Sequence, residues 1–222
     1  MIDQKICFII PAFNEQNTIS EVIYKIQDYG DIIVVDDCST DKTKEILSKL
    51  KVINVRHNNN LGYDLSLNTG FKKAYELNMN FAITIDADGQ HDIRDAKKII
   101  DLLQIGNAIV TGRRKYLPRF TEKMFSFYTK IFYNISDPLC GLKGYNLKDC
   151  KDFDILNPNN QIGTKILLNC KRKNLKIEEF EIKQINRVDS SRYGGSLKAN
   201  IKIFKILFLL ILKDLLRLFK II

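Results

Sequence analysis

The chain has 222 residues, 45% of them hydrophobic, which is enough for one compact domain with a large core. Its 35 Lys and Arg residues exceed its 26 Asp and Glu residues, and the net charge of +9 favours an anionic partner: nucleic acid, an anionic membrane or a phosphorylated substrate. The five cysteines form no Cys-x-x-Cys pair, which disfavours a disulfide framework or a zinc site. The sequence shows no signal peptide and no apolar run of membrane-spanning length, so we expect a cytoplasmic protein.

Short apolar runs alternate with segments of helical period over the first part of the chain. Strands are predicted at Lys5–Ile10, Asp31–Asp36, Lys51–Arg56, Phe81–Asp86 and Ala108–Gly112. Helices are predicted at Glu15–Asp28, Asp41–Leu50, Tyr63–Leu77 and Asp92–Leu103. The strands are continuously apolar and do not alternate, so this repetition predicts an α/β fold with a mostly parallel sheet covered by helices on both faces.

The pattern changes after Arg114. An aromatic-rich helix is predicted at Phe120–Asn134, followed by the turn-rich loop Asp137–Gly141. A helix at Gln161–Lys173, a strand at Leu175–Ile185 and a mobile loop at Val188–Ser196 complete the main domain. We therefore divide the chain into an α/β domain of residues 1–197 and a C-terminal amphipathic helix of residues 198–222.

Acidic residues follow the predicted strands, at the sheet edge where ligands bind in such folds. Asp86 and Asp88 lie two apart at a strand end, and residues i and i+2 of an extended segment project to the same side. Two such carboxylates can hold a hard divalent cation such as Mg²⁺ or Mn²⁺, which also takes phosphate oxygens. This cation would neutralise charge on a leaving diphosphate, and Gln90 could add a neutral oxygen ligand.

The Asp-x-Asp pattern is weak when it stands alone. The chain contains a second instance, Asp152 and Asp154, in a segment that follows no strand, and an isolated instance is more often a solvated turn. The first instance differs because it directly follows the apolar run Phe81–Ile85.

Several segments together resemble glycosyltransferase family 2, in order and at suitable spacing. They are Ile9–Glu15 (IIPAFNE), Val34–Asp41 (VVDDCSTD), Asn60–Gly62 (NLG), Asp86–His91 (DADGQH) and Gly112–Arg114 (GRR). The loop Asp137–Tyr145 looks like that of the branch containing dolichyl-phosphate mannose synthase and polyprenyl-phosphate sugar transferases. The match covers roughly residues 5 to 200.

The resemblance implies a GT-A catalytic domain and an inverting transfer from a nucleotide-diphosphate sugar. By motif position, the donor would be contacted by Pro11, Phe13, Glu15, Val35, Asp37, Asp86, Ala87 and Asp88. The metal would be held by Asp86, Asp88 and Gln90. The catalytic residues would be Asp88, Arg114, which faces the phosphates, and Arg192, on a loop that closes over the donor.

Structural interpretations remain open for several of these residues. Pro11 can equally end a strand, Asp36 can orient its loop, and Glu15 can interact with a helix dipole. Arg192 can be an ordinary surface arginine, and His91 can be a structural neighbour of the site.

The acceptor is expected to be a lipid phosphate. A phosphate monoester is largely ionised at neutral pH, so it needs cationic positioning more than the general base that a hydroxyl requires. Lys165 stands where many relatives have a glutamate, which argues against a carboxylate base there. The segment Tyr63–Ser66 also departs from the pattern of the family, since small residues are more usual at positions 64 and 66.

The C-terminal segment also indicates a lipid connection. A wide Ile, Leu and Phe face is accompanied by basic residues near one side, which fits a helix lying in the membrane interface. These residues are Lys202, Lys205, Lys213, Arg217 and Lys220, with Asp214 beside them. We expect peripheral contact with the inner face of the cytoplasmic membrane, the alternative being a helix packed on the domain or on a second subunit.

Four other functions stay open. The runner-up is transfer to a growing glycan, such as a lipopolysaccharide or capsule intermediate. A non-catalytic nucleotide-sugar-binding protein is a lower alternative. A nucleotidyltransferase would carry a glycine-rich loop where this chain has Pro11–Glu15, and a nucleic-acid binder would rest on charge alone.

Overall fold

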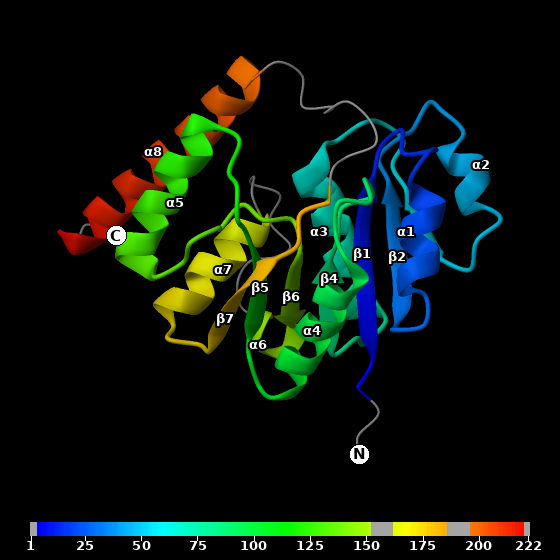
Figure 1. The fold of residues 1–222 in the computed structure, drawn as a ribbon, viewed down its shortest axis with the longest axis horizontal. Coiled ribbons are helices and arrows are strands. Elements are labelled where there is room, and N and C mark those ends of the chain that lie inside the picture. Colours follow the sequence, from blue (N-terminus) through cyan, green and yellow to red (C-terminus); the bar gives the residue numbers. More distant parts are fainter. Residues whose placement is uncertain (1–3, 152–161, 186–195, 220–222) are drawn as a thin grey trace.

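The computed structural model describes residues 4–151, 162–185 and 196–219, and it has the predicted α/β architecture (Figure 1). Seven strands form one sheet in the order β3-β2-β1-β4-β6-β5-β7. The strands are β1 Ile6–Ala12, β2 Asp31–Asp36, β3 Ile53–Arg56, β4 Phe81–Thr84, β5 Ile109–Arg114, β6 Lys143–Asn146 and β7 Ile177–Ile182. All neighbouring strands pair in parallel except β6, which is antiparallel to both β4 and β5.

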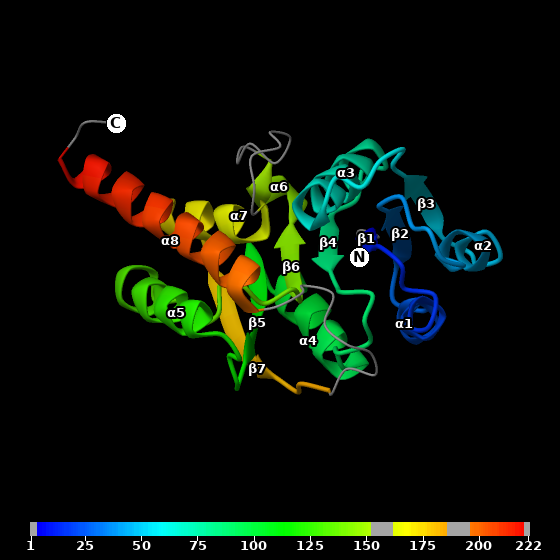
Figure 2. The same ribbon diagram turned by 90° about the horizontal axis from the view of Figure 1, so that it is seen from above.

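Helices cover both faces of the sheet (Figure 2). They are α1 Ile19–Ile26, α2 Thr43–Leu47, α3 Tyr63–Glu76, α4 Ile93–Gln104, α5 Phe120–Tyr133, α6 Leu147–Cys150, α7 Ile162–Arg172 and α8 Ser196–Leu218. One apolar cluster packs α1, α2 and α4 on the sheet, and a second packs α3, α5, α7 and α8 on the opposite face. Burial at Ala96, Ile99, Ile100 and Leu103 of α4 shows the helical period that the sequence predicted.

The sequence prediction missed β6 and the short α6. β6 has the sequence Lys-Gly-Tyr-Asn and offers no apolar run to mark it as a strand. It is nevertheless central, because a Cβ on Gly144 would lie 2.2 Å from Cγ2 of Ile99, so only a glycine lets α4 pack this closely. Arg192, Asp152 and Asp154 lie outside the described residues.

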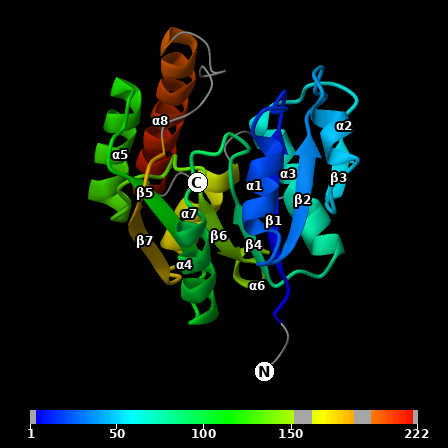
Figure 3. The ribbon, with the colours of Figure 1, turned by 45° about the vertical axis from the view of Figure 1, so that its right-hand side comes forward.

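Helix α8 lies beside α5, at the end of the molecule away from β3 (Figure 3). The sequence placed Asp214 beside the basic side chains of this helix. In the structure, Asp214 instead points inward. Its carboxylate accepts hydrogen bonds from the hydroxyls of Tyr128 and Tyr133 on α5 and pairs with Arg172 on α7 at 2.8 Å. Burial and this carboxylate raise the pKa of Tyr133 to about 12. Across the ranges that the structure describes, every helix falls short of the length or apolarity that a membrane span requires.

We predict that Asp214→Ala lowers the free energy of unfolding by about 2 kcal/mol, because it removes the acceptor of two tyrosine hydroxyls and the carboxylate partner of a partly buried arginine. Urea denaturation followed by circular dichroism measures this change. Glu45→Ala on the exposed side of α2 is the control, with an expected change below about 0.5 kcal/mol. Equal stabilities of the two variants would contradict the structural role of Asp214.

Candidate functional site

The carboxyl ends of β1, β2 and β4 meet at one edge of the sheet. Ala12 pairs with Asp36 at the ends of β1 and β2, and Ile9 pairs with Thr84 at the end of β4. The loops that follow β1 and β2 are joined by hydrogen bonds. Asn14, with a φ of 55°, accepts from the backbone N–H of Thr40 through its side-chain oxygen at 2.7 Å. The acidic segments predicted to form a site therefore lie together.

The residues of the first two strand ends that were predicted to contact the sugar-nucleotide donor are buried or hydrogen-bonded within the protein. Val35 is fully buried in the core, Pro11 is buried in β1, and Phe13 is half-buried. The Glu15 carboxylate accepts from the hydroxyl of Thr18 at 3.0 Å. Their contacts with a donor stay predictions.

Asp37 is buried and organises the loop that precedes α3. Its carboxylate accepts the backbone N–H groups of Leu61 at 2.8 Å and Gly62 at 2.7 Å. Nδ1 of His57 lies 2.7 Å from the same carboxylate, and Nε2 of His57 lies 2.9 Å from the hydroxyl of Thr69. The neighbouring Asp36 is fully buried and pairs with Arg56. Asp37, directly after β2, thus fixes the course of the chain into α3, and Asp36, the last residue of β2, holds Arg56 at the end of β3.

The Asp86 side chain is 31% exposed at this edge. Oδ1 accepts from the hydroxyl of Tyr63 at 2.8 Å, and Oδ2 lies 3.4 Å from Nε2 of His91. Burial raises the pKa of Asp86, but the hydrogen bonds from His91 and Tyr63 and the charge of Lys143 outweigh it, so the pKa lies below its ordinary value. The Asp86 carboxylate is therefore ionised at neutral pH.

β4 ends at Thr84, and Ala87 and Asp88 lie in a turn, so the extended geometry that the sequence predicted for Asp86 and Asp88 is not observed. Ala87 is buried in the core cluster, and the flanking Asp86 and Asp88 are half-buried. Oδ1 of Asp88 accepts from the backbone N–H of Gln90 at 3.1 Å. The backbone carbonyl of Gln90 accepts from the N–H of Ile185 at 3.2 Å, which connects this segment to the chain after β7.

The donor set suits a hard cation. In the described part of the chain, no three or more His, Cys, Asp and Glu side chains are grouped to hold a metal ion. Asp86 and Asp88 offer carboxylate oxygens that Mg²⁺ or Mn²⁺ accepts, and such an ion fills its remaining positions with waters and substrate phosphates. The residues present therefore fit a metal that binds together with a diphosphate.

Gly141 forms the wall behind Asp86. A Cβ at position 141 would lie 2.2 Å from Oδ2 of Asp86 and 2.8 Å from its Cγ. The carbonyl of Gly141 accepts from the hydroxyl of Thr84 at 2.8 Å, which fixes the Asp137–Gly141 loop against the end of β4. The absence of a side chain here is thus a condition for the observed position of Asp86.

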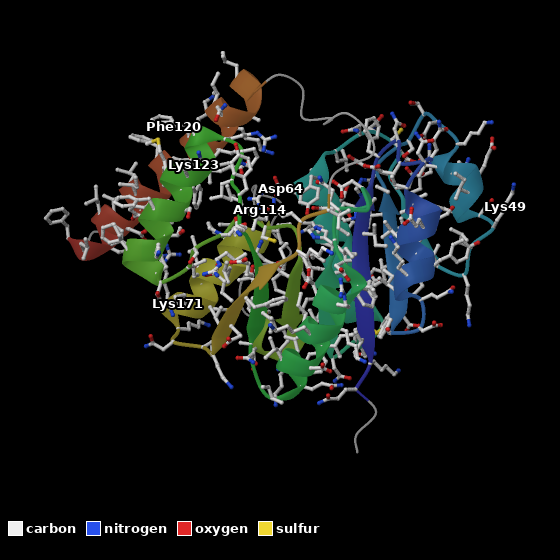
Figure 4. The ribbon with its side chains drawn as sticks, in the orientation of Figure 1. Lys49, Asp64, Arg114, Phe120, Lys123 and Lys171 are labelled. Carbon is white, nitrogen blue, oxygen red and sulfur yellow. The ribbon has the colours of Figure 1, made fainter. Side chains whose placement is uncertain are left out.

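Arg114 is the last residue of β5 (Figure 4), and its half-buried side chain faces two buried carboxylates. Its guanidinium makes two hydrogen bonds to Asp137, at 2.8 and 3.0 Å, and lies 3.5 Å from Glu122. Burial lowers the pKa of Arg114, but Asp137 and Glu122 outweigh it and the net shift is upward. Lys143, also buried, donates to the carbonyl of Cys140. The predicted phosphate-facing arginine is thus fixed in place, and its contact with phosphate stays a prediction.

Sequence reasoning missed several groups that shape this site. Tyr63 was noted only within an unusual segment, and His57, Asp137 and Glu122 were given no role. Hydroxyls and charges that act through tertiary contacts leave no periodic signal in the sequence. The loop motif Asp137–Gly141 was recognised, but the proximity of Gly141 to Asp86 depends on the antiparallel strand β6 that follows it.

Comparison with known proteins gives consistent results. The family described as Glycosyl transferase family 2 matches residues 7–150. The uncharacterized protein MJ1222 of Methanocaldococcus jannaschii is 33% identical, over 95% of this chain and 93% of that protein. The UDP-N-acetylglucosamine–dolichyl-phosphate N-acetylglucosaminyltransferase of Methanococcus voltae is 32% identical, over 92% of this chain and 95% of that protein.

The fold is shared with a solved enzyme. The crystal structure of glucosyl-3-phosphoglycerate synthase from Mycobacterium tuberculosis, in complex with Mn²⁺, UDP and phosphoglyceric acid, superposes with a TM-score of 0.69 at 18% identity. The superposition covers 92% of this chain and 78% of that one. The predicted GT-A fold is confirmed.

We predict that Gly141→Ala displaces the Asp86 carboxylate and lowers the free energy of unfolding by about 1–3 kcal/mol, because the added methyl group overlaps it. A crystal structure of the variant and urea denaturation measure the two effects. Gly163→Ala in α7 is the control for the position of Asp86, since its Cβ would lie 3.1 Å from the hydroxyl of Tyr145 and would not meet Asp86, so we expect the Asp86 carboxylate to stay in place. An unmoved Asp86 in Gly141→Ala would contradict this account.

Proposed function

The chain belongs to glycosyl transferase family 2 and is a glycosyltransferase, and from this premise we propose that it transfers a hexose from a nucleotide-diphosphate sugar to a polyprenyl or dolichyl phosphate. The reaction would be metal-dependent, would invert the anomeric configuration, and would take place at the cytoplasmic face of the membrane. The alternative acceptor is a growing glycan.

The observation that carries the proposal is the position of the two half-buried carboxylates Asp86 and Asp88 at the carboxyl edge of the sheet. This edge is where α/β folds bind ligands, and Asp86 is held there by Tyr63 and His91. Mg²⁺ or Mn²⁺, when bound, neutralises charge that develops on a leaving diphosphate. We assign the ion to Asp86, Asp88 and Gln90, and the nucleoside to the loops after β1 and β2.

The chemistry needs one bond to form and one to break. An oxygen of the ionised acceptor phosphate attacks the anomeric carbon on the face opposite the diphosphate, and the bond from that carbon to the diphosphate oxygen breaks with its electrons on the leaving group. No proton has to be removed from the acceptor, because the phosphate is already largely ionised near pH 7. In this scheme Arg114 and Arg192 attract phosphate oxygens and need not exchange protons.

Two observations support a lipid-phosphate acceptor. The Methanococcus voltae relative is named for transfer to dolichyl phosphate, and the match covers 92% of this chain and 95% of that protein. In the late helix α7, position 165 is a lysine and not a carboxylate, so the described part of α7 supplies no acidic base at that position.

Two adjacent helices support contact with a membrane. On α8, exposed apolar side chains recur every three or four residues at Ile201, Phe204, Phe208, Leu212 and Leu215. Lys202, Lys205, Lys213 and Arg217 are exposed along one flank of this row. Helix α5 adds exposed Phe120, Met124, Phe127 and Ile131. Apolar rows beside basic residues are complementary to the interface of an anionic membrane.

We predict that the protein forms labelled lipid from at least one radiolabelled UDP- or GDP-sugar when polyprenyl phosphate and Mn²⁺ or Mg²⁺ are supplied, and that EDTA abolishes the product. Asp88→Ala should lower the rate by about 100-fold or more, since even outer partners of metal ligands cost 10–100-fold. Asp152→Ala, in the second Asp-x-Asp, is the control and should leave the rate unchanged. No labelled lipid with any common donor would refute the acceptor, and an unchanged Asp88→Ala rate would refute the metal assignment.

We further predict that Phe204→Glu with Phe208→Glu weakens binding to vesicles of phosphatidylglycerol and phosphatidylcholine by at least about tenfold, because each phenylalanine contributes about 1.5–3 kcal/mol on burial. Co-sedimentation measures the bound fraction. Tyr24→Glu is the control, since Tyr24 is equally exposed but lies on α1. A dimer in solution that the double variant dissociates, without loss of vesicle binding, would assign this face to a second subunit instead.

A further inference from the structure

The first turn of α3 contacts three functional parts of the molecule. The N–H of Gly62, the residue before the helix, donates to Asp37 at the end of β2. The hydroxyl of Tyr63 donates to Asp86 after β4, at 2.8 Å. Asp64 pairs with Lys202 on α8 at 3.3 Å. Consecutive residues thus touch the predicted nucleoside side, the predicted metal side and the C-terminal helix.

We propose that Tyr63 is a positioning residue, whose hydroxyl orients the Asp86 carboxylate for the divalent cation and the sugar diphosphate. This inference rests on the metal role proposed above for Asp86. It assigns a function to a segment, Tyr63–Ser66, that departs from the pattern of the family.

The position of Tyr63 is fixed from the nucleoside side. Gly62 has a φ of +90°, a conformation that L side chains rarely adopt, so the chain turns here in a way that favours glycine. Asp37 holds this turn through the N–H groups of Leu61 and Gly62, and its carboxylate is in turn oriented by His57. The hydroxyl of Ser66 donates to the carbonyl of Gly62 at 3.1 Å and closes the first turn of the helix.

The orientation of the Asp86 carboxylate depends on a hydrogen-bond donor such as the Tyr63 hydroxyl. Its contact with His91 is long, at 3.4 Å, whereas the contact with Tyr63 has the length of a good hydrogen bond. On its other side lies Gly141, which has no side chain to donate a hydrogen bond to the carboxylate. Tyr63 therefore determines which way the oxygens face. Groups that hydrogen-bond to a metal-binding carboxylate in this way typically set metal affinity.

The test is Tyr63→Phe, which removes the hydroxyl and keeps the ring. Mn²⁺ is titrated into the protein with saturating UDP, and free Mn²⁺ is followed by electron paramagnetic resonance. We expect Mn²⁺ affinity to fall by about tenfold. In the transfer assay, the Mn²⁺ concentration for half-maximal rate should rise by a similar factor, while kcat at saturating Mn²⁺ changes much less.

Tyr75→Phe is the matched control, because Tyr75 lies on the same helix and its hydroxyl donates to the carbonyl of Leu147, away from the site. It should leave Mn²⁺ affinity unchanged, and urea denaturation of both variants separates loss of metal from loss of folding. Unchanged Mn²⁺ affinity in Tyr63→Phe, or an equal loss of affinity in both variants, would overturn the proposed role of Tyr63 and leave the proposed metal site standing. Failure of the wild-type protein to bind Mn²⁺ with UDP would overturn the proposed metal site together with it.

Discussion

The carboxylate of Asp86 has to remain charged two residues after β4, a strand whose residues are all buried. Burial at this position disfavours the charge, and hydrogen bonds from Tyr63 and His91 with the nearby Lys143 reverse that effect. These partners come from α3, from the segment before α4, and from β6. The packing of those elements on the sheet is therefore what places an ionised group at the edge where an anionic donor and its cation would bind.

The antiparallel direction of strand β6 is a second constraint on the site. It enters antiparallel between β4 and β5, so the chain that precedes it passes the carboxyl end of β4. The Asp137–Gly141 loop is thereby brought against Asp86 on one side, through Gly141, and against Arg114 on the other, through Asp137. The Asp137–Gly141 loop thus contacts both the basic Arg114 and the acidic Asp86 and fixes the positions of both.

The central parallel strands β1, β2 and β4 could be predicted from the sequence because each contains an apolar run, and α1 and α4 because each has a buried apolar stripe. The edge strands β3 and β7 are interrupted by polar residues. The motifs could be placed close to the strand ends, although β4 ends at Thr84 and not at Asp86. β6 escaped prediction because Gly144 is chosen for close packing and not for strand propensity. Tyr63 escaped because its partner is 23 residues away in sequence, and no periodic pattern encodes such a contact. The inward direction of Asp214 could not be predicted for the same reason, because its partners are distant in sequence.

That inward direction determines how α8 presents its apolar residues. A helix with apolar side chains around most of its circumference could pack on the domain in several rotations. Only a rotation that turns Asp214 toward Tyr128, Tyr133 and Arg172 supplies a carboxylate in this environment with partners. In that rotation Leu207 and Leu210 are buried, and Phe204 and Phe208 face outward. The exposed apolar row is therefore a consequence of a polar contact on the opposite face, and more apolar packing on the domain would require breaking it.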